Sequence, residues 1–235
     1  MPQWKCDLLE DLANKQQEPT ILVGKAVKLV QALDMEFFGL SLHLHVAAHS
    51  PQVLLYNNYP PEWNERYQAD NFITIDPTVS KCYQTTLPVL WNDTLFQDVP
   101  HLREAACAHG MVHGWSQSVH DLRHNETQIS VSRPSRTIST YELYEKSADV
   151  MWLGNVLHAA LSEYHLNKIC PLPPLSKREI EVYKWVAWGK TSNEVGMILG
   201  LSTSTVNFHT RNVILKTGAA NKAGALMILF MHGLL

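Results

Sequence analysis

The stretch GKTSNEVGMILGLSTSTVNFHTRNVILK, residues 189–216, holds two short helical patterns with very few residues between them. The first pattern opens with a capping box at Thr191 and ends at Gly200. The second begins at Ser202 and continues to about Thr217. A connection this short joins two helices at a sharp angle, so the stretch predicts a helix-turn-helix.

The second of these helices has two distinct faces. Its valines and threonines recur at helical spacing and predict a stripe that packs on a core. Another face carries polar side chains three and four residues apart, which suit contacts to bases and phosphates in a major groove. The residues on that face are Ser204, Asn207 and Arg211. Flanking residues that could reach the DNA backbone are Thr205, His209 and Lys216.

Helix ends supply further candidates for phosphate contacts, because backbone amides there favour anions. These candidates are Lys190, Thr191 and Lys222. Charge agrees with this interpretation. From Cys170 onward the chain has seven basic and three acidic residues, whereas residues 1–169 have 12 basic and 19 acidic ones. A basic segment after an acidic body predicts a polyanionic partner, double-stranded DNA. The alternative is a solvated polar face on an ordinary helical hairpin.

A proline-rich stretch, KICPLPPLS at residues 168–176, marks the boundary between two domains. We expect an N-terminal domain over residues 1–168, a linker over 169–175 and a helical domain over 176–235. In the N-terminal part, Leu40, Leu42 and Leu44 alternate as in a strand. Later strand patterns and a long helix that opens with a capping box from Ser139 to Glu142 follow. The fold class is therefore α+β, with a sheet flanked by helices.

Composition limits the cellular context. Apolar residues make up 46% of the 235 residues, enough for a sizeable core. The four cysteines are scattered with no CxxC pair, as is typical of a reducing compartment. The beginning of the chain lacks a signal-peptide pattern, and the apolar run ALMILFM is too short to span a bilayer. We expect a cytoplasmic protein with no membrane contact.

The apolar run ALMILFM also predicts a homodimer surface, with a crowded small core as the alternative.

Two further stretches complete the sequence pattern. They are NNYPPEWNERYQADNFITIDPTV at residues 57–79 and PVLWND at 88–93. With the helix-turn-helix segment, they resemble the quorum-sensing regulators of the LuxR type. The resemblance covers nearly the whole chain. It implies an N-terminal α/β/α sandwich with a central antiparallel sheet and a C-terminal all-α helix-turn-helix domain. It also implies an N-acyl-homoserine lactone as effector, a dimer on an inverted-repeat promoter site, RNA polymerase as a further partner, and no cofactor, metal or catalytic site.

The resemblance also implies which residues line the effector pocket. Matched position by position, they are Tyr59, Trp63, Tyr67, Asp76, Thr78, Trp91 and Ser130. We add Phe96 for ring surface and Gly39 for the space that it leaves beside an acyl tail. The chemistry is consistent, because the ligand needs an apolar cavity with a few placed polar groups. Without the resemblance, the same aromatic cluster would be read as plain core.

The pocket residues divide the polar groups of such a ligand among them. The indole N–H of Trp63 suits the lactone carbonyl, since it can only donate. A buried Asp76 must accept hydrogen bonds, and the ligand's amide N–H supplies one. Tyr59 and Ser130 can donate to the acyl carbonyl.

Other readings compete with this one. His43, His45 and His49 could ligate a metal in an enzyme, but the chain has no GxSxG, HExxH or P-loop pattern. A response-regulator output domain would need a receiver with alternating parallel strands and helices, which is not seen. Within the LuxR type, the alternatives are a regulator without its own synthase that responds to exogenous or non-lactone molecules, and a sequestering anti-activator.

Overall fold

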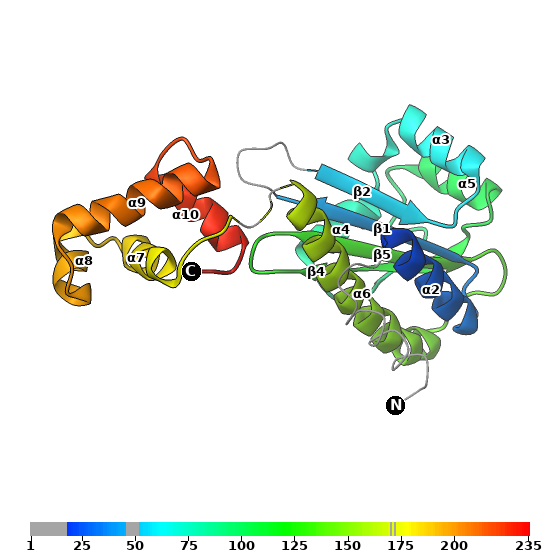
Figure 1. The fold of residues 1–235 in the computed structure, drawn as a ribbon. Helices are drawn as coiled ribbons and strands as arrows, with labels where there is room; N and C mark the ends of the chain where they lie inside the picture. Colours follow the sequence, from blue (N-terminus) through cyan, green and yellow to red (C-terminus); the bar gives the residue numbers. More distant parts are fainter. Residues whose placement is uncertain (1–17, 46–51, 170, 172) are drawn as a thin grey trace. The chain divides into compact units, whose positions relative to one another are not determined.

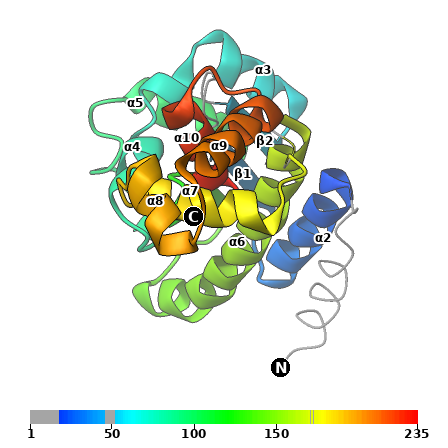
Figure 2. The same ribbon diagram turned by 60° about the vertical axis from the view of Figure 1, so that its left-hand side comes forward.

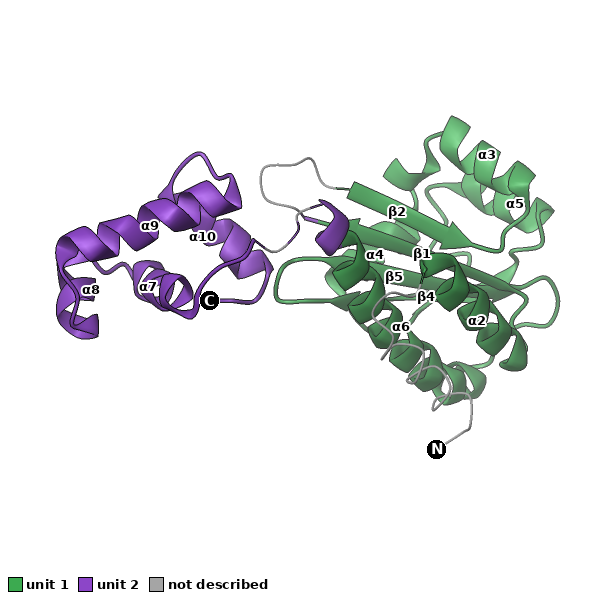
Figure 3. Cartoon of the chain, in the orientation of Figure 1, with its two compact units in different colours: residues 1–44, 52–165 green, residues 45–51, 166–235 purple. Residues whose placement is uncertain are grey.

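The computed structural model describes residues 18–45, 52–169, 171 and 173–235. Its contacts divide the chain into two compact units (Figure 3). Unit 1 lies within residues 1–44 and 52–165, and unit 2 lies within residues 45–51 and 166–235. The segment considered above for a signal peptide falls in residues 1–17, outside the described residues. Each unit is described by itself below.

Unit 1 is built on one antiparallel sheet, which has five strands in the described part of the chain. The strands are β1 (Phe37–Leu44), β2 (Gln52–Asn57), β3 (Val89–Leu90), β4 (His113–His120) and β5 (Glu126–Arg133). Their order across the sheet is β2-β1-β5-β4-β3, with every neighbouring pair antiparallel. Helices cover both faces (Figures 1 and 2). The predicted α/β/α sandwich with a central antiparallel sheet is confirmed.

One face of the sheet is aliphatic and packs on two helices, α2 (Pro19–Ala32) and α6 (Thr140–Ile169). Leu40 and Leu42 of β1 are buried there, as the alternating pattern predicts. Leu40 lies opposite Ile129 of β5, and Ile129 approaches Gly154 of α6. The predicted stripe of α6 is also buried. Its members are Leu143, Val150, Leu153, Leu157 and Leu161. This face forms the main core of the unit.

The other face is covered by short elements: α3 (Pro61–Ala69), the 3₁₀ turn η1 (Phe72–Thr74), α4 (Pro77–Gln84) and α5 (Pro100–Ala108). Each of the three helices begins at a proline, whose fixed φ suits a first helical position and whose missing N–H is not needed there. Large side chains from these elements form a second apolar cluster, which includes Trp63, Phe72 and Phe96. The strands below it present small or polar residues, so this layer does not pack as densely on the sheet.

Unit 2 contains the helices α7 (Lys177–Ala187), α8 (Ser192–Leu199), α9 (Thr203–Thr217) and α10 (Lys222–Met231). Complete capping boxes open α7, at Ser176, and α8, at Thr191, and the second is the one predicted from the sequence. Gly200 ends α8 with a φ of 65°, a conformation that glycine adopts without strain. The turn that follows passes so close to Gly196 that a Cβ there would lie 2.7 Å from the backbone oxygen of Leu201. The helix-turn-helix is confirmed.

The core of unit 2 is made by side chains from all of these helices. Val206 and Val213 of α9 are fully buried, as the predicted stripe requires, and they pack with Tyr183 and Leu229. Among the described helices, none alone is long and apolar enough to cross a membrane. Only α9 and α10 taken together pass such a test, and a bend of 65° separates them.

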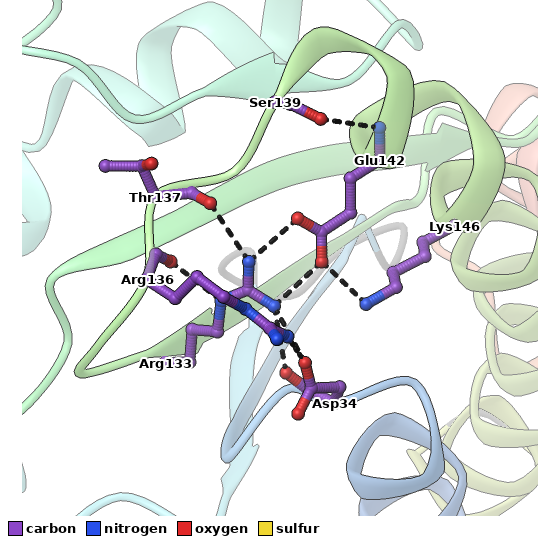
Figure 4. A network of polar contacts seen from close by, with 7 residues as sticks. All are labelled: Asp34, Arg133, Arg136, Thr137, Ser139, Glu142 and Lys146. Carbon is purple, nitrogen blue, oxygen red and sulfur yellow. Dashed lines mark hydrogen bonds and ion pairs between the residues drawn. The ribbon is translucent and has the colours of Figure 1, made fainter.

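An arginine at the end of β5 ties three parts of unit 1 together (Figure 4). The buried Arg133 guanidinium donates to both carboxylate oxygens of Glu142 in α6, at 2.7 and 2.8 Å. It also donates to Asp34, which follows α2, and to the carbonyl oxygens of Arg136 and Thr137. The cap of α6 therefore differs from the predicted box. Ser139 does accept from the Glu142 N–H, but the Glu142 carboxylate is held by Arg133 instead of turning back to the cap.

We predict that Glu142→Gln lowers the free energy of unfolding at pH 7 by about 2–3 kcal/mol. The Arg133 guanidinium, with help from Lys146, holds the pKa of Glu142 at about 2, against 4.5 ordinarily. A lowered pKa in the folded state means that the ionised carboxylate stabilises the fold above pH 4.5, and that this contribution is lost as the pH falls toward 2. Urea unfolding as a function of pH measures the effect.

The matched control is Glu145→Gln, which removes an exposed carboxylate from the same helix and should change stability by less than about 0.5 kcal/mol. The difference in the free energy of unfolding between wild type and Glu142→Gln should disappear at acid pH. A gap that stays constant from neutral to acid pH would contradict the assigned role of this ion pair.

Candidate functional site

The layer of short helices and the sheet of unit 1 enclose a pocket. Its cavity measures about 120 Å³, and since roughly 10–15 Å³ of such space suffices for one water, it has room for a small organic molecule. Every residue predicted for the ligand pocket lines it: Gly39, Tyr59, Trp63, Tyr67, Asp76, Thr78, Trp91, Phe96 and Ser130. Aliphatic side chains from the sheet edge and from neighbouring elements line it as well, including Leu55, Ile73 and Val79.

Asp76 is the acidic group among the pocket's lining residues. It is the N-cap of α4, where its Oδ1 accepts from both the backbone N–H and the hydroxyl of Thr78, at 2.8 and 2.7 Å. Its Oδ2 accepts from the Tyr67 hydroxyl at 3.0 Å. Burial raises the pKa of Asp76 above its ordinary value, and these hydrogen bonds offset only part of that rise. Among the side-chain hydroxyls of the pocket, Oδ2 accepts only from Tyr67, so it remains open to a donor from a ligand.

Tyr59 presents its hydroxyl to the pocket over Gly39. Burial and, after it, the neighbouring Asp76 raise the pKa of Tyr59, so the phenol stays protonated and can donate. A Cβ at position 39 would overlap the Tyr59 ring and hydroxyl. The space that Gly39 leaves therefore admits Tyr59 to the pocket, and its predicted place beside an acyl tail stays a prediction.

Trp63 lies between rings at the centre of the second apolar cluster. Its ring centroid is 5.5 Å from that of Tyr67 and 6.1 Å from that of Phe72, and only 5% of the residue is exposed. Its indole N–H makes no hydrogen bond to any residue that the structure describes. Since a buried indole N–H usually has a partner, Trp63 can supply the donor that the sequence predicts.

Trp91 has a different role from Trp63. Its indole N–H donates to the hydroxyl of Ser116 at 2.9 Å, and that hydroxyl is 2.8 Å from the hydroxyl of Ser130. Trp91 therefore offers ring surface, together with Phe96, which it meets edge-on at 6.4 Å between centroids. Gly114 allows this placement, because a Cβ there would lie 2.8 Å from the Trp91 ring. Ser130 is linked to the indole through Ser116.

Sequence reasoning missed several polar residues of this region, among them Ser116, Gln128 and Arg103. Gln128 lines the pocket from β5 and donates through Nε2 to the Thr78 hydroxyl at 3.1 Å. Arg103 lines it from α5, donates to the carbonyl oxygen of Val112 and lies over the Phe96 ring at 5.2 Å. Position on the pocket side of a strand or helix is the only signal in the sequence that points to them.

Unit 2 carries the predicted polar face on α9. Ser204, Asn207 and Arg211 are exposed, and they make no hydrogen bond or ion pair with any described residue. Lys222 is exposed at the start of α10. A row of uncommitted polar side chains along one helix face is the arrangement that major-groove reading requires.

Four of the other residues predicted to contact DNA also make contacts within the unit: Lys216, Thr191, Thr205 and Lys190. The ammonium group of Lys216 is 2.8 Å from the buried carboxylate of Glu179, so it contributes to the fold of the unit. Thr191 caps α8, and the Thr205 hydroxyl is 2.8 Å from that of Ser202. Lys190 lies 3.7 Å from Glu194. His209 is half-buried, and its Nδ1 has no hydrogen-bond partner among the described residues.

The histidine cluster considered for a metal site is only partly described. His49 lies outside the described residues, whereas His43 and His45 lie at the end of β1 or just after it. Within the described ranges, no group of three or more His, Cys, Asp or Glu side chains is arranged to hold a metal ion.

Comparison with known proteins finds a family match for each of the two parts of the chain. Residues 22–161 match the autoinducer binding domain family, and residues 173–229 match the bacterial regulatory proteins of the luxR family. The transcriptional activator protein PhzR of Pseudomonas fluorescens is 33% identical, over 85% of this chain and 83% of PhzR. The chain belongs to the LuxR family.

Solved structures of this family share the fold. The crystal structure of Escherichia coli SdiA superimposes with a TM-score of 0.77 at 31% identity, over 99% of this chain and 98% of SdiA. A structure of SdiA in complex with octanoyl-rac-glycerol gives a TM-score of 0.71 at 31% identity, over 98% and 96% of the two chains. The pocket of this LuxR-family chain lies within its autoinducer binding domain, and the α9 face lies within its luxR-type domain.

We predict that Asp76→Asn leaves the unliganded LuxR-family chain at least as stable at pH 7 as the wild type. Because folding raises the pKa of Asp76, the ionised carboxylate opposes folding at neutral pH, and this cost falls as the pH drops through the raised value. Asparagine keeps a capping oxygen and carries no charge. Urea unfolding without ligand measures the difference.

The matched control is Asp70→Asn, an exposed aspartate that ends α3 and should be nearly neutral. If Asp76→Asn instead unfolds about 2 kcal/mol more easily at pH 7, the carboxylate stabilises the fold and the assigned effect of burial is wrong.

Proposed function

We propose that this LuxR-family chain is a transcriptional activator that binds an N-acyl-homoserine lactone in the pocket of unit 1. One observation carries the proposal. Around one cavity, a donor-only indole at Trp63, a protonated phenol at Tyr59 and a buried carboxylate at Asp76 all have hydrogen-bonding capacity left. An acyl-homoserine lactone has two carbonyl acceptors, one amide donor and an apolar chain, so it complements this set.

The binding mode follows from which group can donate. The indole N–H of Trp63 donates to the lactone carbonyl, and the Tyr59 hydroxyl donates to the acyl carbonyl. The ligand's amide N–H donates to Asp76, which thereby gains the additional partner that its burial requires. The acyl chain extends along the aliphatic lining. Each neutral hydrogen bond contributes about 1 kcal/mol, and the one to the carboxylate contributes about 1.5–3 kcal/mol.

DNA binding in this proposal needs a dimer. Met227 and Phe230 of α10 and Leu215 of α9 are exposed although they are large and apolar. Covering them with a second copy of the chain would remove that surface from water. A twofold dimer presents two α9 helices to the half-sites of an inverted repeat. The promoter-bound dimer then recruits RNA polymerase in the cytoplasm.

A second candidate ligand is a neutral acyl ester of glycerol. The SdiA complex with octanoyl-rac-glycerol motivates it, because that molecule combines an acyl carbonyl with hydroxyl donors. In this chain, a glycerol hydroxyl would replace the amide N–H at Asp76. Such a ligand would suit a regulator that responds to molecules other than lactones, with or without a synthase of its own. An anti-activator that only sequesters its partners is less favoured, since the α9 face is exposed.

We predict that Trp63→Phe lowers affinity for acyl-homoserine lactones by about tenfold, because it removes one donor and keeps the ring. The measurement expresses the full chain with a panel of lactones and acylglycerols, and identifies by mass spectrometry which of them co-purify. The matched control is Trp91→Phe. The N–H of Trp91 is engaged by Ser116, so this change should disturb the pocket without removing a ligand contact.

If acylglycerols co-purify and no lactone does, the second candidate replaces the first. If nothing co-purifies and the chain alone binds its DNA site at full affinity, the whole proposal fails.

We predict that Arg211→Ala weakens binding to a specific inverted-repeat site by about 1–3 kcal/mol, with a smaller effect on scrambled DNA. The site is selected from a random pool by the liganded wild type, and affinities are compared at two salt concentrations. Lys184→Ala, which removes an exposed charge from α7, should leave the ratio of specific to scrambled binding unchanged. Equal losses on both DNAs for Arg211→Ala would mean that Arg211 contacts only phosphate.

A further inference from the structure

Gln128 of β5 has a hydrogen-bonding group that the fold does not use. The residue is 6% exposed and lines the pocket. Its Nε2 donates to the hydroxyl oxygen of Thr78 at 3.1 Å. Its Oε1 is buried and has no hydrogen-bond partner among the residues that the structure describes. A buried acceptor without a partner costs stability, so it points to a ligand that provides a donor.

The orientation of the Gln128 amide follows from the groups around it. Thr78 has one hydroxyl proton, and its oxygen lies 2.7 Å from Oδ1 of Asp76. That carboxylate oxygen also accepts the Thr78 N–H at 2.8 Å, so it is the acceptor here and the Thr78 hydroxyl proton is directed to it. The Thr78 oxygen can then only accept from Gln128, which places the NH₂ group of the amide on that side. The group left without a partner is therefore the carbonyl oxygen, an acceptor.

The ligand must supply the donor, and the proposed binding mode limits which one. An acyl-homoserine lactone has a single donor in its common part, the amide N–H. That donor goes to Asp76, because a carboxylate is a stronger acceptor than a neutral amide oxygen. Both carbonyl groups of the ligand are acceptors. A donor for Gln128 can then come only from a substituent on the acyl chain.

The register of the sheet indicates where along the chain that substituent lies. Ser130 is opposite Gly39, over which Tyr59 holds its hydroxyl. Gln128 is opposite Ser41, two residues further along the same face and about 7 Å away. If Tyr59 binds the acyl carbonyl, the side chain of Gln128 lies beside the next few carbons.

We propose that Gln128 is a specificity-determining residue that accepts a hydrogen bond from a hydroxyl near the start of the acyl chain, so that the pocket selects 3-hydroxyacyl lactones. This inference rests on the proposed lactone-binding function. A 3-oxo group would place its carbonyl oxygen, an acceptor, beside the Gln128 Oε1, which is also an acceptor. An unsubstituted chain would leave Oε1 without a hydrogen-bond partner.

The test is a competition. The full chain is produced with an equimolar mixture of unsubstituted, 3-oxo and 3-hydroxy lactones of one chain length, and the bound molecules are quantified by mass spectrometry. Wild type should enrich the hydroxylated form about tenfold over the unsubstituted one, and more over the 3-oxo form. Gln128→Met is close in size but has no amide acceptor. In this variant the ratio of bound 3-hydroxy lactone to bound unsubstituted lactone should be near one.

The matched control is Gln117→Met. Gln117 is equally buried, but it lies on the face toward α6, where its amide donates to the carbonyl oxygen of Ser147. This variant should keep the wild-type preference. Equal binding of the three lactones by wild type would overturn the inference, as would an unchanged preference in Gln128→Met. If Gln128→Met does not accumulate, the wild-type ratio alone decides. Failure of wild type to bind any lactone would overturn the proposed function and this inference with it.

Discussion

The buried carboxylate of Asp76 is the constraint on which the ligand site depends. An anion in an apolar pocket must receive hydrogen bonds, and the chain supplies them, among others from the N–H and hydroxyl of Thr78 and from Tyr67. They do not cancel the cost of burial, since the pKa of Asp76 is still raised. A ligand that donates to this group therefore relieves a cost present in the empty protein. Because it binds only the folded chain, its binding also stabilises unit 1 by mass action.

The two faces of the central sheet explain how one layer serves both the core and the pocket. Successive side chains of a strand point to opposite faces of the sheet, so the two faces can carry different kinds of residue. Leu40 and Ile129 point toward α6 and are packed against it, so the sheet is stabilised from that side. Gly39, Ser130 and Gln128 point the other way, and their small or polar side chains leave a cavity beneath the aromatic layer. The packed side and the pocket side of the sheet are therefore built from different residues of the same strands.

The sequence predicted those features that arise locally. Alternation along 40–44 identified β1, and the capping box at Thr191 located the start of α8. The pocket residues are spread over several elements, and only the resemblance to a family connected them. The elements β2, β3, α4 and α5 were not predicted, since they are short and their shape depends on packing. The ion-pair partners of Glu142 and Lys216 were also not predicted, because each pair forms between residues that only the tertiary fold brings together.

The polar residues of unit 2 show why a sequence motif overstates an interface. Thr191 and Lys216 fit a phosphate-contact pattern, yet one caps a helix and the other neutralises the buried Glu179. Removing either would weaken DNA binding partly by destabilising the unit, so the loss could not be assigned to a contact. Asn207 and Arg211 contribute no hydrogen bond or ion pair to the described part of the fold. Replacing either should leave the fold of the unit intact, so an effect on DNA binding at these positions would report on the proposed interface.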